Sequence, residues 1–407
     1  MKITELPKEI LILCQEYIIL EKEQRWEFGC NPYERDWTLF TAINKSLQDL
    51  RKETIFLLLN REFSCMFLRD SEFREKVLNS VSSSRKQLGL DLSDEVLEEF
   101  DVPLLSNILY VNLERSTLPK EYLFQNIGHI ILQDFNCEAL DLTRFRGIEL
   151  CCIYDTPIRN LSLMDASVKG LILNEVPNVF PMEGEWSPDI ECLTICDEAV
   201  TDADLYRFAN VKKKLVLTSV SILNLLSFRF IKELVLIQIP AVEVIPVMPQ
   251  LEILQLLDCT AIREFPRLPN LRHLSLEYCT GIPSLDLSFF PNLRELILAT
   301  CDGLQQLDLS GGVSFAPLYK ASLLVCTNLE VLRISRNIGF LTVEDCVSLR
   351  SIEISDSHRV YSCRVENGRN PVIATKKPVV TPSIQGQVNI LITPKKVKSK
   401  DRLLCGI

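Results

Sequence analysis

The sequence predicts an α/β solenoid, in which a short repeated unit stacks parallel strands into one sheet. The main observation is a spacing of apolar residues that recurs after 20 and then 22 residues: Leu251, Leu254 and Leu256; Leu271, Leu274 and Leu276; Leu293, Leu296 and Leu298. A cysteine follows the first leucine of each set by eight positions, at Cys259, Cys279 and Cys301. The last two leucines of each set alternate with one other residue, which is the period that places side chains on one face of a strand.

A single repeat of this kind is too small to fold alone. Burying about three or four large apolar side chains contributes roughly 1.5–3 kcal/mol each. Fixing the backbone of about 20 residues costs roughly 1–2 kcal/mol per residue. Only stacked neighbours provide a continuous core. Because every repeat runs in the same direction, we expect the strands to be parallel.

The pattern LxxLxLxxC at these periods resembles the leucine-rich repeat. The resemblance implies an arc with a parallel β-sheet on its concave face. The returning segments, such as IREFPRLPN and VEVIPVMPQ, are rich in proline and too short for long helices. We therefore expect short irregular or extended segments on the convex side.

The repeats extend over residues 85–364. Their first apolar residues are Ile108, Ile127, Ile148, Val168, Ile190, Ile231, Leu251, Leu271, Leu293, Leu329 and Leu349. Residues 214–217 supply a degenerate repeat between Ile190 and Ile231. Gln87–Leu92 is expected to be the first strand, and Ser93-Asp94-Glu95 the start of a short helix with acidic residues in its first turn.

The repeat pattern is interrupted once and then stops. Leu304, Leu307 and Leu309 repeat the strand spacing early, and Gly311-Gly312 breaks it, which we interpret as an irregular insertion over 311–325. The repeats end near Ile354. Residues 365–407 are rich in lysine and proline and are expected to form a basic, flexible tail, with one last strand near 388–393.

Residues 1–84 have helical spacing instead. Apolar residues from Trp37 to Arg61 predict a long helix, and Asp70-Ser71-Glu72 predicts the start of another. Within this range, Leu6-Pro7-Lys8-Glu9-Ile10-Leu11, followed later by Leu39, Ala42, Ile43, Asn44-Lys45 and Leu47, resembles an F-box. The gap between the two parts is longer than in that family.

The F-box resemblance implies a function. In that family a three-helix unit docks onto a Skp-type adaptor and joins a substrate-binding domain to a cullin–RING ubiquitin ligase. Carried over to this chain, the adaptor-binding residues are Leu6, Pro7, Ile10, Leu11, Ile43 and Leu47. The alternative is a plain helical cap that shields the first repeat, which solenoids need in any case.

Composition argues against several classes of function. The net charge of −10 disfavours general nucleic-acid binding, and the sequence has no apolar run long enough for a membrane span. The start, MKITELPKEI, lacks the features of a secretory signal, so we expect a cytoplasmic protein, with the nucleus as a second location. We expect a monomer outside its complex.

No catalytic or metal-binding pattern is found. The fifteen cysteines include no CxxC pair, and those at repeat positions are expected to be reduced core thiols. His129, His273 and His358 lie in different repeats, with no ligand cluster at metal spacing. We therefore expect no enzyme activity and no cofactor.

Function is thus expected on a surface. Apolar residues between the buried leucines predict a partner-binding patch on the concave face, made of Val235, Ile237, Ile253, Leu257 and Tyr278. Two hypotheses follow: a substrate-recruiting subunit of a Skp/cullin/F-box-type ubiquitin ligase, or a stand-alone scaffold or effector whose N-terminal helices only cap the solenoid.

Overall fold

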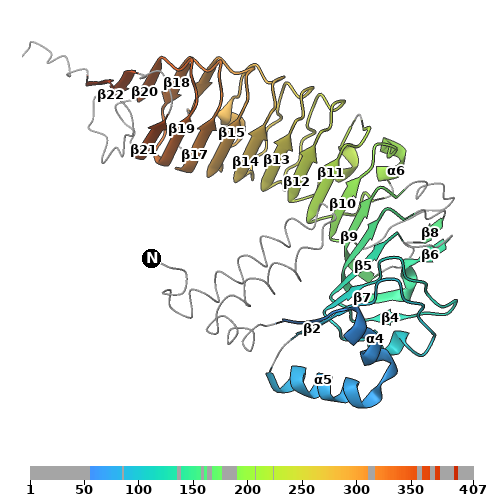
Figure 1. The fold of residues 1–407 in the computed structure, drawn as a ribbon. Coiled ribbons are helices and arrows are strands. Elements are labelled where there is room, and N and C mark those ends of the chain that lie inside the picture. Colours follow the sequence, from blue (N-terminus) through green and yellow to red (C-terminus); the bar gives the residue numbers. More distant parts are fainter. Residues whose placement is uncertain are drawn as a thin grey trace, which may run out of the picture. The chain divides into compact units, whose positions relative to one another are not determined.

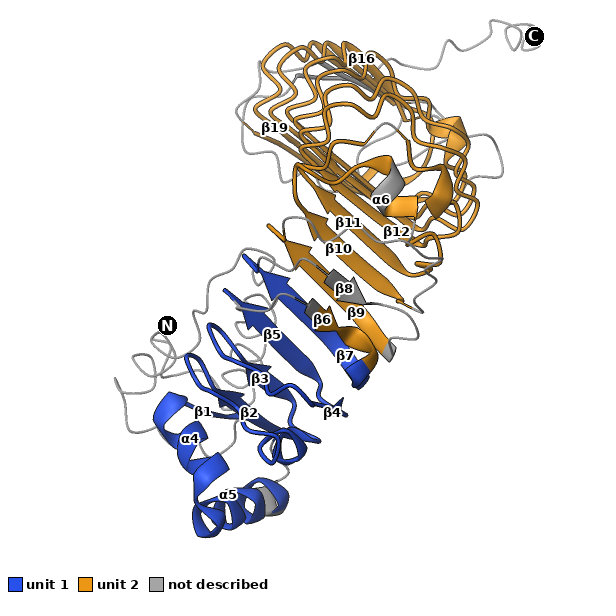
Figure 2. Cartoon of the chain, turned by 90° about the vertical axis from the view of Figure 1, so that its right-hand side faces the viewer, with its two compact units in different colours: residues 1–138, 144–158 blue, residues 139–143, 159–407 orange. Residues whose placement is uncertain are grey.

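A computed structural model describes residues 56–84, 87–134, 139–156, 160–162, 167–176, 190–206, 208–222, 224–309, 317–354, 360–366, 372–375 and 389–392 (Figure 1). The chain divides into two compact units (Figure 2). Unit 1 comprises residues 1–138 and 144–158, and unit 2 comprises residues 139–143 and 159–407. Stacked parallel strands with few helices make up the described part of both units, which confirms the predicted solenoid.

The strands of unit 1 are parallel and follow the chain in the order β1, β2, β3, β5 and β7, with the short β4 beside β7. Their bounds are β1 Phe56–Leu59, β2 Gln87–Asp91, β3 Tyr110–Asn112, β4 Phe124–Gln125, β5 His129–Gln133 and β7 Phe145–Tyr154. The unit also holds helices α4 Arg61–Arg69 and α5 Ser71–Ser84 and a 3₁₀ helix at Val102–Leu105.

Two side chains at helix starts explain where α4 and α5 begin. Asn60 accepts a hydrogen bond from the Phe63 N–H at 3.1 Å, and Asp70 accepts from the Glu72 and Phe73 N–H groups at 2.9 and 3.0 Å. The helix start predicted at Asp70 is therefore confirmed. The helix α4, which runs between these two residues, buries Phe67 and Leu68.

Two local predictions in unit 1 are wrong. The helix expected over 37–61 does not reach its predicted end, because Phe56–Leu59 is the strand β1, paired with β2. The residues of that helix before Phe56 lie outside the described part. The helix expected from Ser93 is a turn, since Asp94 has a φ of 59° and ends the β2 repeat as a left-handed corner.

In the described part of unit 2, the main sheet contains ten parallel strands in chain order. Their bounds are β9 Ser167–Asn174, β10 Cys192–Cys196, β11 Lys214–Thr218, β12 Glu233–Ile237, β13 Ile253–Leu257, β14 His273–Glu277, β15 Glu295–Ala299, β17 Leu318–Leu324, β19 Ile338–Glu344 and β21 Val360–Glu366. A short pair, β6 Ala139–Asp141 and β8 Asn160–Ser162, a short helix α6 Asp202–Tyr206 and two 3₁₀ turns at Leu226–Phe228 and Leu287–Phe289 also belong to this unit.

A second parallel sheet lies in the same unit and was not expected from the sequence. Its strands are β16 Gln306–Asp308, β18 Val331–Ile334, β20 Ser351–Ile354, β22 Val372–Thr375 and β23 Asn389–Ile392. Leu329 and Leu349 precede β18 and β20, so the repeats assigned to them belong to this sheet. The repeats also do not stop at Ile354, because β21, β22 and β23 follow.

Each turn of the main sheet has the same construction. The inward-facing strand residues are buried and, except after β10, the residue after the strand takes a positive φ and donates its N–H to the end of the next strand. Asp258, for example, has a φ of 55° and donates to the Glu277 carbonyl at 2.8 Å. The side chain of Asn270 adds a second link, from its Nδ2 to the Pro249 carbonyl at 2.7 Å. Successive turns are thus joined by both backbone and side-chain hydrogen bonds.

Candidate functional site

The predicted apolar patch lies on the open face of the main sheet, by which we mean the side formed by residues that alternate with the buried ones. Val235 and Ile237 lie on β12 and Ile253 and Leu257 on β13, while Tyr278 directly follows β14. Ile237 is the register partner of Leu257. The structure therefore brings these two side chains together as direct neighbours.

The rest of the patch is divided by polar residues. Val235 faces Gln255, and Ile253 lies between Glu233 and His273 in the register. Of the five predicted residues only Tyr278 is exposed, at 54%, whereas the other four are half-buried. The apolar surface at this place is consequently narrow, with Ile237 and Leu257 at its centre.

A more exposed apolar group lies further along the main sheet, near the starts of β17, β19 and β21. Tyr319 on β17, Phe340 on β19 and Tyr361 on β21 are 58%, 49% and 52% exposed. The rings of Tyr319 and Phe340 meet edge to face, with centroids 5.4 Å apart. We call these three residues the aromatic cluster. Exposed aromatic side chains on adjacent strands are the feature most typical of a protein-binding surface.

The sequence contained a signal for this cluster, but it was hidden. In β17 the position equivalent to Leu296 of β15 is Ala321, so the LxL spacing is absent there. The spacing instead appears at Leu329 and Leu349, which precede strands of the second sheet. The interpretation of residues 311–325 as an irregular insertion is wrong, because Leu318–Leu324 is the strand β17, which pairs with β15 and β19. The expected open face therefore lacked β17 and β19 and their aromatic residues.

Basic residues gather where the strands of the main sheet begin. Five of them lie at the first strand residue or at the residue before it, and the sixth, Lys320, is the third residue of β17 and the register partner of Glu295. We call them the basic row: Lys213, Lys214, Lys232, Arg272, Arg294 and Lys320. Four glutamates lie at the same strand starts: Glu191, Glu233, Glu252 and Glu295. Three of them form ion pairs, Lys213 with Glu191, Lys214 with Glu233 at 2.9 Å and Arg272 with Glu252 at 3.6 Å. Lys232, Arg294 and Lys320 are exposed and have no ion-pair partner within the described ranges.

Acidic residues gather at the opposite ends of these strands. They occupy the last strand residue or the corner after it, and we call them the acidic edge: Asp197, Asp258, Glu277, Glu344, Asp345 and Glu366. The only basic side chain paired with this edge in the described part is Arg364, whose Nη2 lies 2.8 Å from Glu366 Oε1. The strand starts therefore carry an excess of basic side chains, six against four glutamates, whereas the opposite ends carry the acidic edge.

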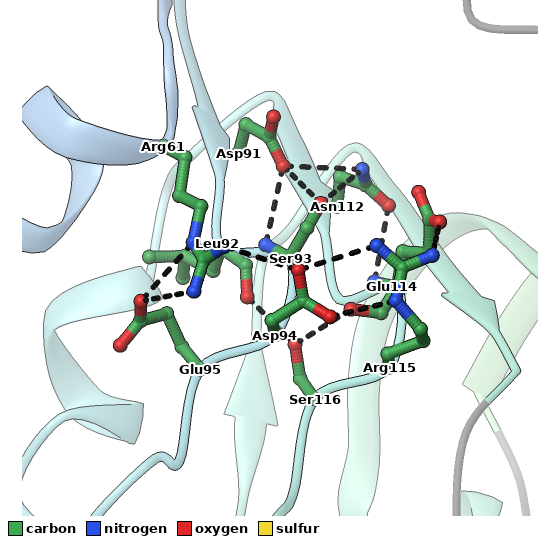
Figure 3. A network of polar contacts seen from close by, with 10 residues as sticks. All are labelled: Arg61, Asp91, Leu92, Ser93, Asp94, Glu95, Asn112, Glu114, Arg115 and Ser116. Carbon is green, nitrogen blue, oxygen red and sulfur yellow. Dashed lines mark hydrogen bonds and ion pairs between the residues drawn. The ribbon is translucent and has the colours of Figure 1, made fainter.

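Unit 1 contains a polar network of a different kind. Asp94 lies between the guanidinium groups of Arg61 and Arg115, at 3.0 Å from the Arg61 Nη1 and 2.6 Å from the Arg115 Nε (Figure 3). The hydrogen bond from Arg115 is the main reason that the pKa of Asp94 lies below its usual range. Arg61 begins α4, so this network attaches the helix to the corners of the first two described turns.

A second part of the network supports those turns from inside. Asn112 is buried and donates through Nδ2 to Asp91 Oδ1 at 3.2 Å and to Ser93 Oγ at 3.1 Å. Ser116 Oγ donates to the Leu92 carbonyl at 2.6 Å (Figure 3). These side chains satisfy backbone and side-chain groups of adjacent turns, so the network serves the fold rather than chemistry.

The repeat cysteines form a ladder inside unit 2. The Sγ of Cys259, Cys279 and Cys301 lies 3.5, 3.6 and 3.3 Å from a carbonyl of the preceding turn, to which the thiol donates. Burial raises the pKa of Cys259 to about 12 and also raises the pKa of Cys279. All cysteines in the described part are free thiols, and the thiols of this ladder are too buried to act as nucleophiles.

The described residues contain neither a metal-binding group nor a membrane-crossing helix. No group of three or more His, Cys, Asp or Glu side chains there could hold a metal ion. No helix there has the length and hydropathy of a membrane-crossing segment. The six predicted adaptor-binding residues, Leu6, Pro7, Ile10, Leu11, Ile43 and Leu47, lie outside the described part.

Comparison with known proteins adds no family. No model of a known protein family matches the chain, and no curated protein matches its sequence.

Proposed function

We propose that the protein is a non-catalytic binding module that holds a protein partner on the open face of the main sheet in unit 2. The observation that carries this proposal is the aromatic cluster, in which Tyr319, Phe340 and Tyr361 are each about half exposed on adjacent strands. Exposing such rings to water is unfavourable unless a partner covers them. The smaller apolar centre at Ile237 and Leu257 lies on the same face and would extend the contact.

We further propose that the solenoid is a leucine-rich-repeat arc with this face on its concave side. The sequence pattern LxxLxLxxC supports the assignment, as do the buried leucines of β12 to β15 and the cysteines that follow the left-handed corners after β13, β14 and β15. The segments that return from one strand to the next are short, with 3₁₀ turns and extended stretches, as expected for repeats of this length.

For the cellular role, we propose a substrate-recruiting subunit of a Skp/cullin/F-box-type ubiquitin ligase. The support is the F-box-like sequence from Leu6 to Leu47. In this role the protein does no chemistry. It raises the concentration of a bound substrate near the ubiquitin-charged enzyme, because both are held in one complex. A stand-alone scaffold or effector is the alternative, and it needs only the binding face.

A binding assay with a purified Skp-type adaptor separates the two roles. The full chain should retain the adaptor, and a variant with Leu6→Asp and Pro7→Ala should lose it. Leu226→Asp is the matched control, since Leu226 is 64% exposed in unit 2 and its change should leave adaptor binding intact. Equal retention by all three proteins, or retention by none, would contradict the ligase role and leave the alternative.

A further inference from the structure

We propose that the basic row binds an acidic, extended segment of the protein partner, laid across the starts of the strands with an apolar residue on the aromatic cluster. This inference rests on the proposed function and names the chemistry of the bound segment. It also sets the direction of that segment: along the solenoid, perpendicular to the strands.

The basic row is continuous with the aromatic cluster through direct backbone contacts. The Arg294 N–H donates to the Arg272 carbonyl at 2.8 Å, and the Lys320 N–H donates to the Arg294 carbonyl at 3.0 Å. Lys320 is in turn the register partner of Phe340. Three cationic residues and then an aromatic ring therefore follow one another on adjacent strands, with Tyr319 beside Lys320.

The glutamates at the strand starts neutralise only part of the charge on this row. Glu191, Glu233 and Glu252 pair with Lys213, Lys214 and Arg272, and Glu295 pairs with His273. Arg294 and Lys320 are exposed and form no ion pair in the described part of the chain, and Lys232 is in the same condition. Arg272 shares its charge with Glu252 but keeps 59% of its side chain exposed. An exposed pair of this kind is weak and can exchange its carboxylate for one supplied by a partner.

The acidic edge determines at which end of the strands an acidic segment can bind. Carboxylates at Asp258 and Glu277 repel an anionic segment from the far ends of β13 and β14. An acidic segment is thus favoured at the strand starts alone.

The spacing of strands determines the length of the segment. Neighbouring strands are roughly 4.8 Å apart, so the distance across the seven strands from β12 to β21 is about 29 Å. An extended chain advances roughly 3.3 Å per residue and needs about nine residues to cover that distance. The expected ligand is a segment of this length with carboxylates toward β12 and an apolar residue toward β21.

The test uses the full chain and a fluorescein-labelled decapeptide of alternating Asp and Glu that ends in Trp-Leu. Fluorescence anisotropy should show binding that weakens as salt is added, because exposed charges are screened. The double variant Arg294→Glu and Lys320→Glu should lower the affinity by about tenfold or more. The matched control is Arg263→Glu with Arg267→Glu, which makes the same change in net charge at exposed residues of a returning segment and should lower it by about twofold at most.

Three outcomes would overturn the inference. The first is an equal loss of affinity in both double variants, which would show attraction to overall charge only. The second is tighter binding of a ten-nucleotide single-stranded DNA than of the peptide, which would assign the row to nucleic acid. The third is no binding of the peptide. If the aromatic-cluster variants described below still lose their partner in that case, the proposed binding function stands and only the acidic segment falls.

Discussion

The rings of Tyr319 and Phe340 meet edge to face on neighbouring strands of the main sheet, 5.4 Å apart and at 72° to each other. Both rings are about half exposed, although an edge-to-face pair of this kind is usual inside a protein core. The pairing holds the two rings in one arrangement before any partner arrives. Less side-chain entropy is then lost on binding, which is how a few aromatic residues come to dominate an interface.

Replacing two rings of the aromatic cluster should therefore remove partner binding without unfolding the chain. In a variant with Phe340→Ala and Tyr361→Ala, we expect a loss of roughly 2–4 kcal/mol in binding free energy, typical of central aromatic residues. Quantitative mass spectrometry of proteins captured by the full chain, compared between wild type and variant, measures this. Tyr206→Ala is the control, because Tyr206 is 71% exposed on α6. An identical capture profile for all three proteins would refute the assignment.

The close approach of Tyr319 to the next strand depends on Gly339. A Cβ atom placed on Gly339 would lie 2.6 Å from the Tyr319 carbonyl oxygen, and backbone at this position cannot move aside cheaply. We expect Gly339→Ala to lower the free energy of unfolding by roughly 1–3 kcal/mol. Gly89→Ala is the matched control: its nearest atom, at 2.8 Å, is the end of the flexible Leu58 side chain, so its cost should be smaller.

Urea unfolding followed by circular dichroism compares the two glycine variants. Equal destabilisation would mean that both sites yield in the same way and that the Tyr319 backbone is not a fixed neighbour. A shift of the aromatic rings should also accompany Gly339→Ala, and the near-ultraviolet spectrum reports it.

The sequence predicted the regular middle of the solenoid because each strand there carries its own signal. Leu254, Leu256 and Cys259 repeat in the next turn as Leu274, Leu276 and Cys279, and the pairing register follows directly. The prediction failed where the leucine spacing is missing from a strand of the main sheet and appears in the second sheet instead. Ala321 replaces a strand leucine, while Leu329 and Leu349 carry the leucine spacing in a second sheet, and periodicity alone does not say to which sheet a strand belongs.

The candidate site was predicted only in part for the same reason. Ile237 and Leu257 lie together as expected, because β12 and β13 are regular. The exposure of these residues depends on the size of their neighbours across the strands, which the spacing of leucines does not encode. The two charged edges required the full register of ten strands, and they emerged only from the three-dimensional pairing.

A strained corner gives a prediction about stability. Val325 follows β17 with a φ of 54°, a conformation that is costly for a β-branched residue and easier for asparagine. Because its side chain is 41% exposed, little burial is lost on replacement. We expect Val325→Asn to raise the free energy of unfolding by about 1 kcal/mol. Val347→Asn, at a residue 44% exposed and outside the positive-φ corners, should not stabilise. Unfolding midpoints that move together in both variants would contradict the argument.

The attachment of α4 to the first turns depends on a carboxylate that has no access to water. The Asp101 side chain is fully buried, and its Oδ1 and Oδ2 lie 2.8 and 2.9 Å from Arg69 Nη1. Asp101 Oδ2 also accepts a hydrogen bond from the Glu98 N–H at 2.8 Å. Replacing Arg69 by glutamine leaves that buried charge without its cation. Since Arg69 is itself 46% exposed and partly screened, we expect a loss of roughly 1–3 kcal/mol rather than more.

The control for Arg69 is Lys76 on α5. Lys76 pairs with Glu72 one helical turn away at 2.6 Å, but both side chains are more than 70% exposed. Lys76→Gln should therefore change the free energy of unfolding by less than about 0.5 kcal/mol. Thermal or urea unfolding of both variants decides the point, and a cost for Lys76→Gln as large as that for Arg69→Gln would disprove the role of burial.

The network around Asp94 should make stability depend on pH in acid. Its pKa is depressed in the folded chain, chiefly by the hydrogen bond from Arg115, so folding favours the ionised form. The stabilisation is complete above the unfolded pKa of roughly 3.9 and is lost as the pH falls through the lower folded value.

The variant Asp94→Asn tests this, because asparagine removes the charge but can adopt the positive φ of 59° at this corner. The unfolding free energies of wild type and Asp94→Asn should differ at about pH 6, and the difference should shrink once the pH falls below the unfolded pKa of roughly 3.9. Asp258→Asn, at a corner with a φ of 55° and no arginine partner in the described part, should show no such decrease in the difference. If the gap between wild type and Asp94→Asn were the same above and below that pKa, the ionised carboxylate would not be the source of the stability.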